Sequence, residues 1–473
     1  MRNLTLLTDL YQLTMLNGYY EKNIHEDIVV FDMFFRKNAC NGGYTIICGI
    51  EQLVEYIHNL HFSDDDLEYL KSLGLFSDKF LDFLKDFKFT GDIYAVEEGT
   101  IMFPKEPIIT VKAPLYQAQL IETALLTIVN FQSLIATKAS RVCYAAKGDP
   151  VFEFGLRRAQ GPDAGTYGAR AAVIGGCAGT ANVLAGKMFD IPVVGTQAHS
   201  WVQKFDNELD SFRAYADVYP DNCLLLVDTY DVLKSGVPNA IKVFDELKAK
   251  GHKPMGIRID SGDLQYLSVE SKKLFEEAGY YDLTYTASND LDEYTIASLK
   301  SSGAAINSWG VGTKLITSAE SPSLGGVYKL AGSYDKDKLI PKIKVSNNTI
   351  KITNPGFKKT YRFYDKKTNK ALADVIALHD EIIPEDNYTI FDQTATWKKK
   401  TLTNYTIRPL QEKIFDNGNL VYTSPALKEI AENAKAELNT LWNEVKRMKN
   451  PHKYYVDLSQ ELWNLKDSML HNL

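Results

Sequence analysis

Two rhythms of hydrophobic and polar residues divide this chain. In the first part, the segment Asp27–Arg36 alternates and is rich in β-formers, whereas Gly49–Leu60 repeats its apolar residues at helical spacing. Residues 115–142 form a long, strongly apolar helix pattern. This mixture predicts an N-terminal α+β domain over residues 1–137.

From about Val151 onward, short apolar runs recur and are separated by amphipathic stretches. The runs are VFEFG, IPVVG, CLLLVD, MGIRID, LTYTAS and INSWGVG, with VYKLAG as a candidate seventh. Apolar strands that alternate with helices are typical of parallel βα units, and six or seven units in succession favour a barrel over an open sheet. We therefore predict an α/β fold: an irregular, TIM-like (β/α) barrel of six to eight strands over residues 138–332, packed against the N-terminal domain.

Beyond Gly332 the composition shifts to lysine, asparagine, threonine and tyrosine. Residues 333–420 are typical of short strands with turns at Asn347–Asn348 and Pro355–Gly356. These strands could rejoin the N-terminal domain, which the sequence alone leaves open. Residues 421–473 contain a long charged helix pattern and predict a helical C-terminal extension.

Composition narrows the class of protein. The net charge of −7 argues against a nucleic-acid partner, which usually selects a basic surface. The five cysteines are scattered without a CxxC pair, which argues against a disulfide framework or a zinc site. No apolar run approaches the ~20 residues of a membrane span, and the N-terminus lacks signal-peptide features. We expect a cytoplasmic protein with no membrane partner.

The candidate chemistry follows the apolar runs, because parallel barrels gather functional groups at the carboxyl ends of their strands. In chain order the candidates are Arg157; Thr196 and His199; Asp228; Arg258, Asp260, Ser261, Gly262 and Asp263; Ser288 and Asn289; and Gly310, Gly312 and Thr313. Taken singly, each feature has an ordinary explanation: a histidine is more often structural, GVGT can be a tight turn, and DSGD can cap a helix. Together, at successive strand ends, they predict a functional site.

The residue types indicate what such a site binds. Glycines in GVGT allow backbone N–H groups to approach a phosphate closely. Carboxylates at Asp228, Asp260 and Asp263 can bind ribose hydroxyls or hold Mg²⁺ against a diphosphate, and Arg157 and Arg258 can clamp anionic oxygens. The residues therefore predict a phosphorylated sugar, with Mg²⁺, and a small planar or acidic second substrate.

Two other classes stay open at this point. A barrel lyase or isomerase acting on a sugar phosphate would use the same phosphate cradle, but no strand-end lysine precedes Lys314. A non-catalytic nucleotide sensor would need only the cradle, and would leave His199, Arg157 and Arg258 unexplained.

The collected motifs resemble the nicotinate phosphoribosyltransferase family. They are LLTDLYQLTM, FGLRRAQG, GTQAHSW, LVDTYD, RIDSGDL, ASNDL, GVGT and SLGGVYKLA, in the order of the family and reaching to about Gly332. The resemblance implies that nicotinate and 5-phosphoribosyl 1-diphosphate give nicotinate mononucleotide and diphosphate, in NAD salvage. It also implies coupled ATP hydrolysis by a ligase-type enzyme, Mg²⁺, and a homodimer.

The resemblance also implies roles for individual residues. His199 corresponds to the histidine that ATP phosphorylates. Tyr11 corresponds to an aromatic residue that reaches the pyridine ring from the partner subunit, and Phe154 to a ring on the other face. The nicotinate pocket is implied at Thr196 and Arg258, with Arg157 beside it. The remaining correspondences are the phosphate cradle at Ser288, Asn289, Gly310, Gly312 and Thr313, and the acidic positions near the ribose and metal at Asp228, Asp260 and Asp263, with Asp228 and Asp260 as metal ligands.

Two related enzymes are the nearest alternatives. Nicotinamide phosphoribosyltransferases place an aspartate where this chain has Ala181, and that carboxylate would repel nicotinate; Ala181 therefore favours the acid. A quinolinate phosphoribosyltransferase would need a more basic pocket for its diacid, and the GTQAHSW segment argues against it.

Overall fold

The computed structural model describes residues 3–472, which divide into two compact units. Unit 1 contains the described residues up to Leu134 and those from Ser323 onward, and unit 2 contains Ile135–Pro322. The predicted boundaries follow residues 137 and 332. The segments 333–420 and 421–473 both fall in the same unit as the N-terminal residues.

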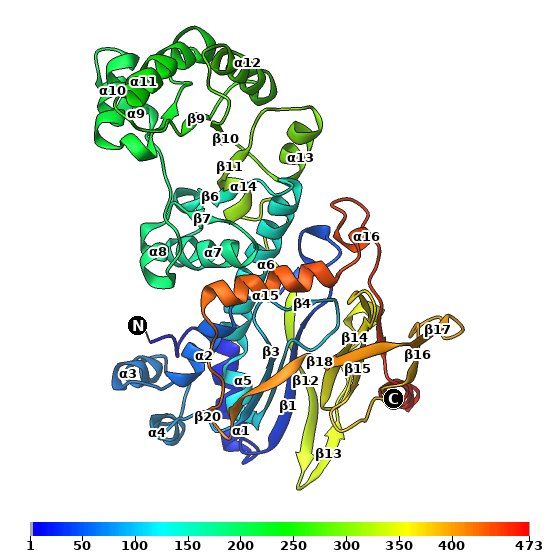
Figure 1. The fold of residues 1–473 in the computed structure, drawn as a ribbon. Helices are drawn as coiled ribbons and strands as arrows, with labels where there is room; N and C mark the ends of the chain where they lie inside the picture. The colour runs from blue at the N-terminus through cyan, green and yellow to red at the C-terminus, as the bar shows by residue number, and fades with distance from the viewer. Residues whose placement is uncertain (1–2, 473) are drawn as a thin grey trace. The chain divides into compact units, whose positions relative to one another are not determined.

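Unit 1 is built on an antiparallel sheet (Figure 1). The strands, in spatial order, are β13 (Lys338–Pro341), β12 (Gly326–Asp335), β1 (Ile28–Phe35), β5 (Ile109–Pro114), β3 (Asp92–Val96), β19 (Gln411–Asp416) and β20 (Asn419–Leu420). The alternating N-terminal segment is thus the central strand β1, which pairs on one side with β5 and on the other with β12 from 300 positions later in the chain. The pairs β1–β12 and β3–β19 bring late segments of the chain beside early ones.

Helices cover the apolar side chains of this sheet. They are α1 (Leu10–Glu21), α2 (Ile50–His58), α3 (Asp64–Ser72), α4 (Asp78–Lys85), α5 (Leu115–Leu120) and the first part of α6 (Glu122–Ala145). The predicted long helix is interrupted at Ile121, so that α5 and α6 are separate. One hydrophobic core joins these helices to strands β1, β3 and β5.

A second, four-stranded sheet of unit 1 uses the lysine-rich part of the chain. Its order is β18 (Tyr405–Pro409), β14 (Lys358–Asp365), β15 (Ala371–Leu378) and β21 (Val456–Leu458). The other elements are the short strands β2 (Thr45–Ile46) and β4 (Ile101–Met102), the hairpin β16 (Asn387–Phe391) and β17 (Lys399–Thr403), and the helices α15 (Leu427–Thr440), α16 (Asn443–Lys446) and α17 (Gln460–His471).

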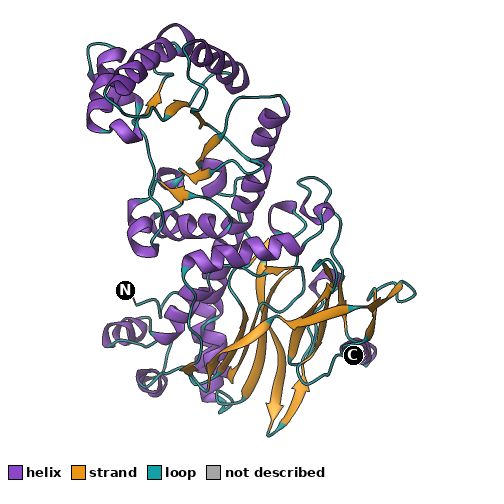
Figure 2. Cartoon of the chain, in the orientation of Figure 1, coloured by secondary structure: helices purple, strands orange, loops and turns teal. Residues whose placement is uncertain are grey.

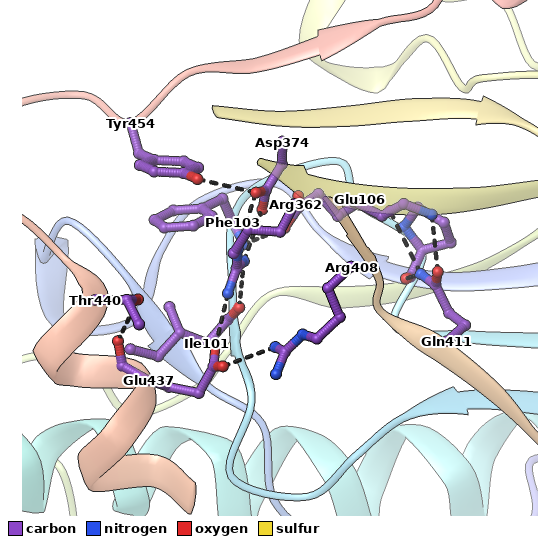
Figure 3. Close-up of polar contacts among 12 residues, drawn as sticks. Ile101, Phe103, Glu106, Arg362, Asp374, Arg408, Gln411, Glu437, Thr440 and Tyr454 are labelled. Atoms are coloured by element: carbon purple, nitrogen blue, oxygen red, sulfur yellow. Dashed lines mark hydrogen bonds and ion pairs between the residues drawn. The ribbon is translucent and has the colours of Figure 1, made fainter. Parts of the chain in front are cut away.

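A buried ionic cluster ties helix α15 to this sheet (Figure 3). Arg362 of β14 is fully buried and donates to Asp374 of β15 and to Glu437 of α15, with each closest N–O distance 2.7 Å. Arg408 of β18 donates to the second oxygen of Glu437 at 2.7 Å. Because a buried charge without a partner is strongly destabilising, these contacts hold α15 in one position on the sheet.

Unit 2 contains a parallel sheet of short strands enclosed by helices (Figure 2). The strands are β6 (Val151–Glu153), β7 (Gly179–Thr180), β8 (Leu224–Leu226), β9 (Gly256–Ile259), β10 (Thr284–Ala287) and β11 (Ser308–Val311). The helices are α7 (Pro162–Ile174), α8 (Val183–Phe189), α9 (His199–Lys204), α10 (Glu208–Val218), α11 (Val237–Ala249), α12 (Leu264–Glu277), α13 (Glu293–Ser301) and α14 (Thr313–Ile316), with the end of α6.

The strand order makes the sheet barrel-like. Sequential strands are neighbours from β8 to β11, and the last strand, β11, pairs in parallel with the first, β6. β7 extends the sheet beyond β6, and a parallel bridge from Thr180 to Val193 extends it once more. Within residues 3–472, no strand pairing joins the Val193 segment to β8. The predicted α/β barrel is confirmed, and it has one seam at this point.

Two of the predicted runs differ from the expected barrel strands. The IPVVG run forms only the single bridge at Val193, because Pro192 has no amide hydrogen to donate to a ladder. The candidate seventh run lies in β12, which belongs to the antiparallel sheet of unit 1. Its buried residues are Tyr328, Ala331 and Gly332, and the rest of the strand is half-buried or exposed.

Candidate active site

The strand ends of unit 2 lie at one edge of the barrel. The parallel register pairs Ala287, the last residue of β10, with Ile259 of β9 and with Trp309 of β11. On the next strand pair, Val311 is opposite Glu153 at the end of β6. The residues that follow these ends are therefore neighbours in space.

Arg258 joins three of these strand ends. Its Nε donates to Ser288 Oγ at 2.8 Å, one terminal nitrogen donates to Thr196 Oγ1 at 2.9 Å, and the other donates to Asp260 Oδ1 at 2.7 Å. The side chain is only 16% exposed. A planar guanidinium held on all its nitrogens is fixed in orientation and presents a defined face to a ligand.

Asp260 is held in its ionised form by the same contacts. Burial acts to raise the pKa of this carboxyl, but hydrogen bonds from Ser288 and Arg258, with the charges of Arg258 and His199, lower it below its usual value. Ser288 donates its hydroxyl to the same oxygen, Oδ1, that Arg258 contacts. The other carboxylate oxygen of Asp260, Oδ2, faces His199.

The imidazole of His199 lies between a hydroxyl group and a carboxylate. Its Nδ1 lies 3.2 Å from Thr229 Oγ1, and its Nε2 lies 3.7 Å from Asp260 Oδ2. The side chain is 40% exposed, so a ligand can reach the ring. A carboxylate on one side favours a proton on the facing nitrogen, which leaves the other nitrogen available as a nucleophile or as an acceptor from Thr229.

Asp228 carries a buried oxygen that the protein does not satisfy. Its Oδ2 accepts from the backbone N–H of Asp260 at 3.1 Å and from Ser261 Oγ at 2.5 Å. Its Oδ1 is buried and has no hydrogen-bond partner among the described residues. Leaving a buried acceptor unsatisfied costs free energy, so this oxygen is suited to a cation or a hydroxyl group of a ligand.

These carboxylates fit Mg²⁺ better than a metal held by protein alone. No group of three or more histidine, cysteine, aspartate or glutamate side chains that could hold a metal occurs within residues 3–472. Mg²⁺ commonly takes one or two carboxylates and completes its octahedron with water and substrate phosphate oxygens. Asp228 Oδ1, which has no partner in the described structure, and Asp260 Oδ2, which faces His199, could supply two such oxygen ligands.

The GVGT loop brings the backbone close to an aromatic ring. A Cβ built on Gly310 would lie 2.6 Å from the ring of Phe154, so only glycine allows the ring its position. Gly312 follows β11, and the short helix α14 begins at Thr313, which is exposed. The loop can thus offer backbone N–H groups beside the face of Phe154.

The loop after β10 is strained. Asn289 and Asp290 have positive φ angles of 98° and 42°, a region that non-glycine residues seldom adopt. Such conformations persist where the surrounding structure imposes them, and they cluster at ligand sites. Here the strained pair directly follows the buried Ser288 that contacts Arg258.

The other predicted residues take no part in the contacts described above. Arg157 is exposed on a short turn after β6, and Asp263 caps α12 by accepting from the N–H of Tyr266 at 2.9 Å. Gly262, with a φ of 81°, makes the turn before that cap. Ala181 follows β7, is half-buried, and donates its N–H to the backbone of Glu153 at 2.9 Å. Tyr11 is on α1 of unit 1 and is 49% exposed.

Three residues of the site were not among those predicted. Thr229 orients His199, and Gln197 is 6% exposed with neither amide atom hydrogen-bonded in the described structure. Glu153 is buried, which raises the pKa of its carboxyl, and it accepts from Thr180 Oγ1 at 2.6 Å and from the N–H of Gly155. Its signal in the sequence is an acid inside an apolar run.

Models of protein families match most of the chain. A nicotinate phosphoribosyltransferase (NAPRTase) N-terminal domain matches residues 6–130, the NAPRTase family model matches 150–372, and the C-terminal domain model matches 357–466.

Individual proteins match over the whole length. A nicotinate phosphoribosyltransferase of Bacillus subtilis (strain 168) is 45% identical, with 100% of this chain and 96% of that protein covered. One from Homo sapiens is 31% identical over 98% and 96% of the two chains. The crystal structure of human nicotinic acid phosphoribosyltransferase superposes with a TM-score of 0.87 at 29% identity, covering 98% of this chain and 99% of that one.

Proposed function

The chain belongs to the nicotinate phosphoribosyltransferase family, and from this premise we propose how its strand-end site works. The enzyme transfers a phosphoribosyl group from 5-phosphoribosyl 1-diphosphate to nicotinate, giving nicotinate mononucleotide and diphosphate in NAD salvage. The observation that carries our assignment of the site is the fixed guanidinium of Arg258, which joins Thr196, Ser288 and Asp260.

We assign the nicotinate pocket to the region of Arg258 and Phe154. The guanidinium supplies the positive charge that a pyridine carboxylate needs, and Thr196 adds a hydroxyl beside it. The ring of Phe154, held against Gly310, offers a flat apolar face for the pyridine. Arg157 is close by in sequence and exposed, and adds positive charge at the entrance.

We assign the phosphoribosyl group to the neighbouring loops. Backbone N–H groups of Gly310, Gly312 and Thr313, with the side chains of Ser288 and Asn289, would hold its 5-phosphate. Asp228, with the short loop of Ser261, Gly262 and Asp263, would accept from the ribose hydroxyls. The strained φ angles after Ser288 support this placement, because strain of this kind gathers at ligand sites.

Asp228 and Asp260 would hold Mg²⁺ together with the diphosphate of the substrate. Bound there, the ion would neutralise the charge that develops on the departing diphosphate. The unsatisfied Oδ1 of Asp228 supports this role.

Glycosyl transfer of this kind develops positive charge on the ribose ring. The C1–O bond to the diphosphate breaks as the pyridine nitrogen forms a bond to C1, and the electron pair leaves with the diphosphate. Fixed groups that favour this charge act without reorganising. The ionised Asp260 is one of them, and its lowered pKa keeps it charged at neutral pH.

His199 would carry a phosphoryl group from ATP. A ring nitrogen attacks the γ-phosphorus, an N–P bond forms as the bond to the β-γ bridging oxygen breaks, and ADP leaves with that electron pair. Its exposure and its contacts with Thr229 and Asp260, which fix the ring, support the role. Later hydrolysis of the phosphohistidine would couple ATP to the overall equilibrium.

A homodimer would complete the pyridine pocket, with Tyr11 of the partner subunit on the face opposite Phe154. The exposure of Tyr11 supports this, as do the exposed apolar side chains Val183, Leu184 and Met188 on α8, which are 71%, 55% and 50% exposed. Clusters of exposed apolar residues commonly mark protein interfaces.

No helix within residues 3–472 is long and apolar enough to cross a membrane. We place the enzyme in the cytoplasm, where scattered cysteines without a disulfide framework are common.

The test is an assay of the purified protein with 5-phosphoribosyl 1-diphosphate and Mg²⁺, offering nicotinate, nicotinamide or quinolinate, with and without ATP. We expect turnover of nicotinate, at least ~100-fold discrimination against the other two acceptors, and a shift toward product with ATP. Preference for nicotinamide or release of CO₂ from quinolinate would overturn the substrate assignment, and identical yields with and without ATP would overturn the coupling.

A further inference from the structure

Unit 1 contains a large cavity that the reaction does not use. Its volume is about 690 Å³, within the range of small-molecule sites. Its walls come from the loop after β4, residues 349–354, the loop after β16, residues 451–457, and α17. Every lining residue belongs to unit 1, so the cavity is distinct from the strand-end site of unit 2.

Lysine ammonium groups lie together in one part of the cavity, and no carboxylate of the described residues is paired with them. Lys105 Nζ donates to the backbone carbonyls of Ile350 and Ile352, and Lys466 Nζ donates to Asn354 Oδ1 at 2.8 Å. Within residues 3–472, neither lysine has a carboxylate within 4.0 Å. The nearby Arg36 has a buried Nε without a hydrogen-bond partner in the described structure.

Burial and neighbouring positive charges lower the pKa of the lysines in this part of the cavity. Burial lowers the pKa of Lys105 to about 8, with Lys466 and Arg36 adding to the effect, and the pKa of Lys466 is lowered by burial and by Lys358. The neighbouring acid, Asp32, is already paired with Lys358 at 2.7 Å. Clustered, partly buried cations without counter-ions are costly, and a bound anion removes that cost.

Aromatic residues also line the cavity. The rings of Phe103 and Tyr454 are stacked, with centroids 3.9 Å apart, and Figure 3 shows them lying face to face beside Arg362. Because they are only 1% and 6% exposed, their faces are not open to a ligand. Trp463 of α17 is half-buried, and its indole N–H donates to the carbonyl of Gln393 at 3.3 Å. An accessible aromatic ring held in this way suits a planar ligand group.

Carboxylates also line the cavity. Asp457 and Asp392 lie near Lys453, and burial with the charge of Asp392 raises the pKa of Asp457 to about 6, although Lys453 acts to lower it. Asp467 also lines the cavity but is paired with His471 at 3.5 Å. The carboxylates of Asp457 and Asp392 can accept from hydroxyl or amino groups of a ligand.

We propose that this cavity binds a nucleoside monophosphate, with its phosphate on Lys105 and Lys466, its base on Trp463 and its polar edge toward Asp457 and Asp392. Lysine ammonium groups are common point-charge partners of phosphate. The cavity lining thus supplies a cationic group for the phosphate, an aromatic ring for the base and carboxylates for the donor edge. This would be a second ligand site, separate from the catalytic one and beyond the proposed function.

The test is a lysine-labelling experiment on the purified full-length protein. A limiting amount of an acetylating reagent is added near pH 7.5, and the rate of acetylation at each lysine is read by mass spectrometry. AMP is the probe, with adenosine and inorganic phosphate as comparison ligands. Lys253, which is 78% exposed and lies in unit 2, is the internal control.

We expect AMP at ten times its dissociation constant to slow labelling of Lys105 about tenfold, because only the free protein reacts. Lys253 should be unaffected, and adenosine at the same concentration should not protect. The Lys466→Met variant should lose most of the protection of Lys105, whereas Lys466→Arg should keep it. Both variants should retain the wild-type KM for nicotinate, which shows that the fold and the catalytic site are intact.

Three outcomes would overturn the proposal. In the first, no ligand protects Lys105. In the second, inorganic phosphate protects as well as AMP at equal concentration, which would make the cavity a phosphate site. In the third, Lys466→Met leaves the AMP protection unchanged. Because each readout is the labelling of a unit 1 lysine, none of them depends on whether the catalytic assignment is correct.

Discussion

The imidazole Nε2 of His199 lies 3.7 Å from Oδ2 of Asp260, although the two residues are separated by strands β8 and β9 in the chain. This distance places the proposed phosphoryl acceptor beside the carboxylate proposed to stabilise the ribose cation. Whatever is attached to His199 therefore acts on the charge of the catalytic site.

The role of His199 predicts a covalent label. Wild-type protein should take up phosphate from γ-labelled ATP, and His199→Ala should take up none and lose ATP stimulation. We expect its kcat/KM for nicotinate to fall at least about tenfold, ~1.4 kcal/mol, because a charged group near the reacting centre is lost. The matched control is His252→Ala, since His252 also contacts an aspartate, Asp221, in the same unit. Equal labelling of His199→Ala and wild type would exclude this histidine.

The Arg258→Lys variant tests whether the site needs the several fixed donors of a guanidinium group. An ammonium group can make only some of the contacts to Thr196, Ser288 and Asp260, and each contact to a charged group contributes about 1.5–3 kcal/mol. We expect kcat/KM for nicotinate to fall by about 100-fold, mostly through KM. Arg213→Lys is the control, because Arg213 pairs with Glu246 at the surface. A variant with wild-type KM would show that the carboxylate binds elsewhere.

Ala181→Asp should change the choice of acceptor. The added carboxylate at the end of β7 would repel nicotinate, so its kcat/KM should fall about tenfold, ~1.4 kcal/mol, while nicotinamide is used at least as well as before. The neutral Ala181→Asn is similar in size and separates charge from bulk. If both variants behave alike, the effect is steric, and position 181 does not distinguish nicotinate from nicotinamide by charge.

Asp228→Asn should weaken the response to Mg²⁺. Its amide oxygen can still accept from Ser261 and from the N–H of Asp260, but an uncharged NH2 group then stands in place of the buried Oδ1 and cannot bind a cation. Half-maximal activity should require at least about tenfold more Mg²⁺. Without Mg²⁺ the free energy of unfolding should be unchanged or higher, because a partnerless buried charge is gone. Asp231→Asn, an exposed helix cap three residues later, is the control and should leave the Mg²⁺ response unaltered.

Asp457 predicts a pH dependence of stability. Burial and Asp392 raise the pKa of this carboxyl to about 6 in the folded protein, above its ordinary value of 3.8. A raised pKa means that its contribution to stability is present at pH 4 and is lost as the pH rises through 6. Asp457→Asn should therefore equal the wild type at pH 4 and be more stable by about 1–2 kcal/mol at pH 8, allowing for solvent screening. Urea unfolding at both pH values measures this, and a difference that is the same at pH 4 and pH 8 would contradict it.

Much of the site follows from the apolar runs alone. Parallel strands align their carboxyl ends, so the residues after VFEFG, CLLLV, GIRID and LTYTA had to meet at one edge. The contact of Arg258 with Ser288 and that of the Asp260 N–H with Asp228 bring the ends of CLLLV, GIRID and LTYTA together. The IPVVG run predicted a strand of its own, yet Pro192 limits it to one bridge, because a missing amide hydrogen is a local property that an apolar count does not register.

Other features depend on positions that no local pattern connects. The contact of Thr229 with His199 and the partnerless oxygen of Asp228 require side-chain orientations, which periodicity does not fix. The cavity of unit 1 combines the loop of Lys105 with α17, which carries Lys466, and these segments lie far apart in the chain. Lysines and aromatic residues in separate loops are ordinary surface residues until the fold brings them together.

The side chains proposed to act in catalysis also span the seam of the barrel. Backbone pairing stops at Val193 and resumes at β8, and side chains span the gap: Thr196 receives a hydrogen bond from Arg258, and His199 meets Thr229 just after β8. At this seam the barrel is therefore held together by side-chain contacts of Thr196 and His199, the residues proposed to bind nicotinate and to carry phosphate. A ligand bound at Thr196 or a phosphoryl group on His199 would replace these contacts, so the proposed chemistry would act on the hydrogen bonds that span the seam.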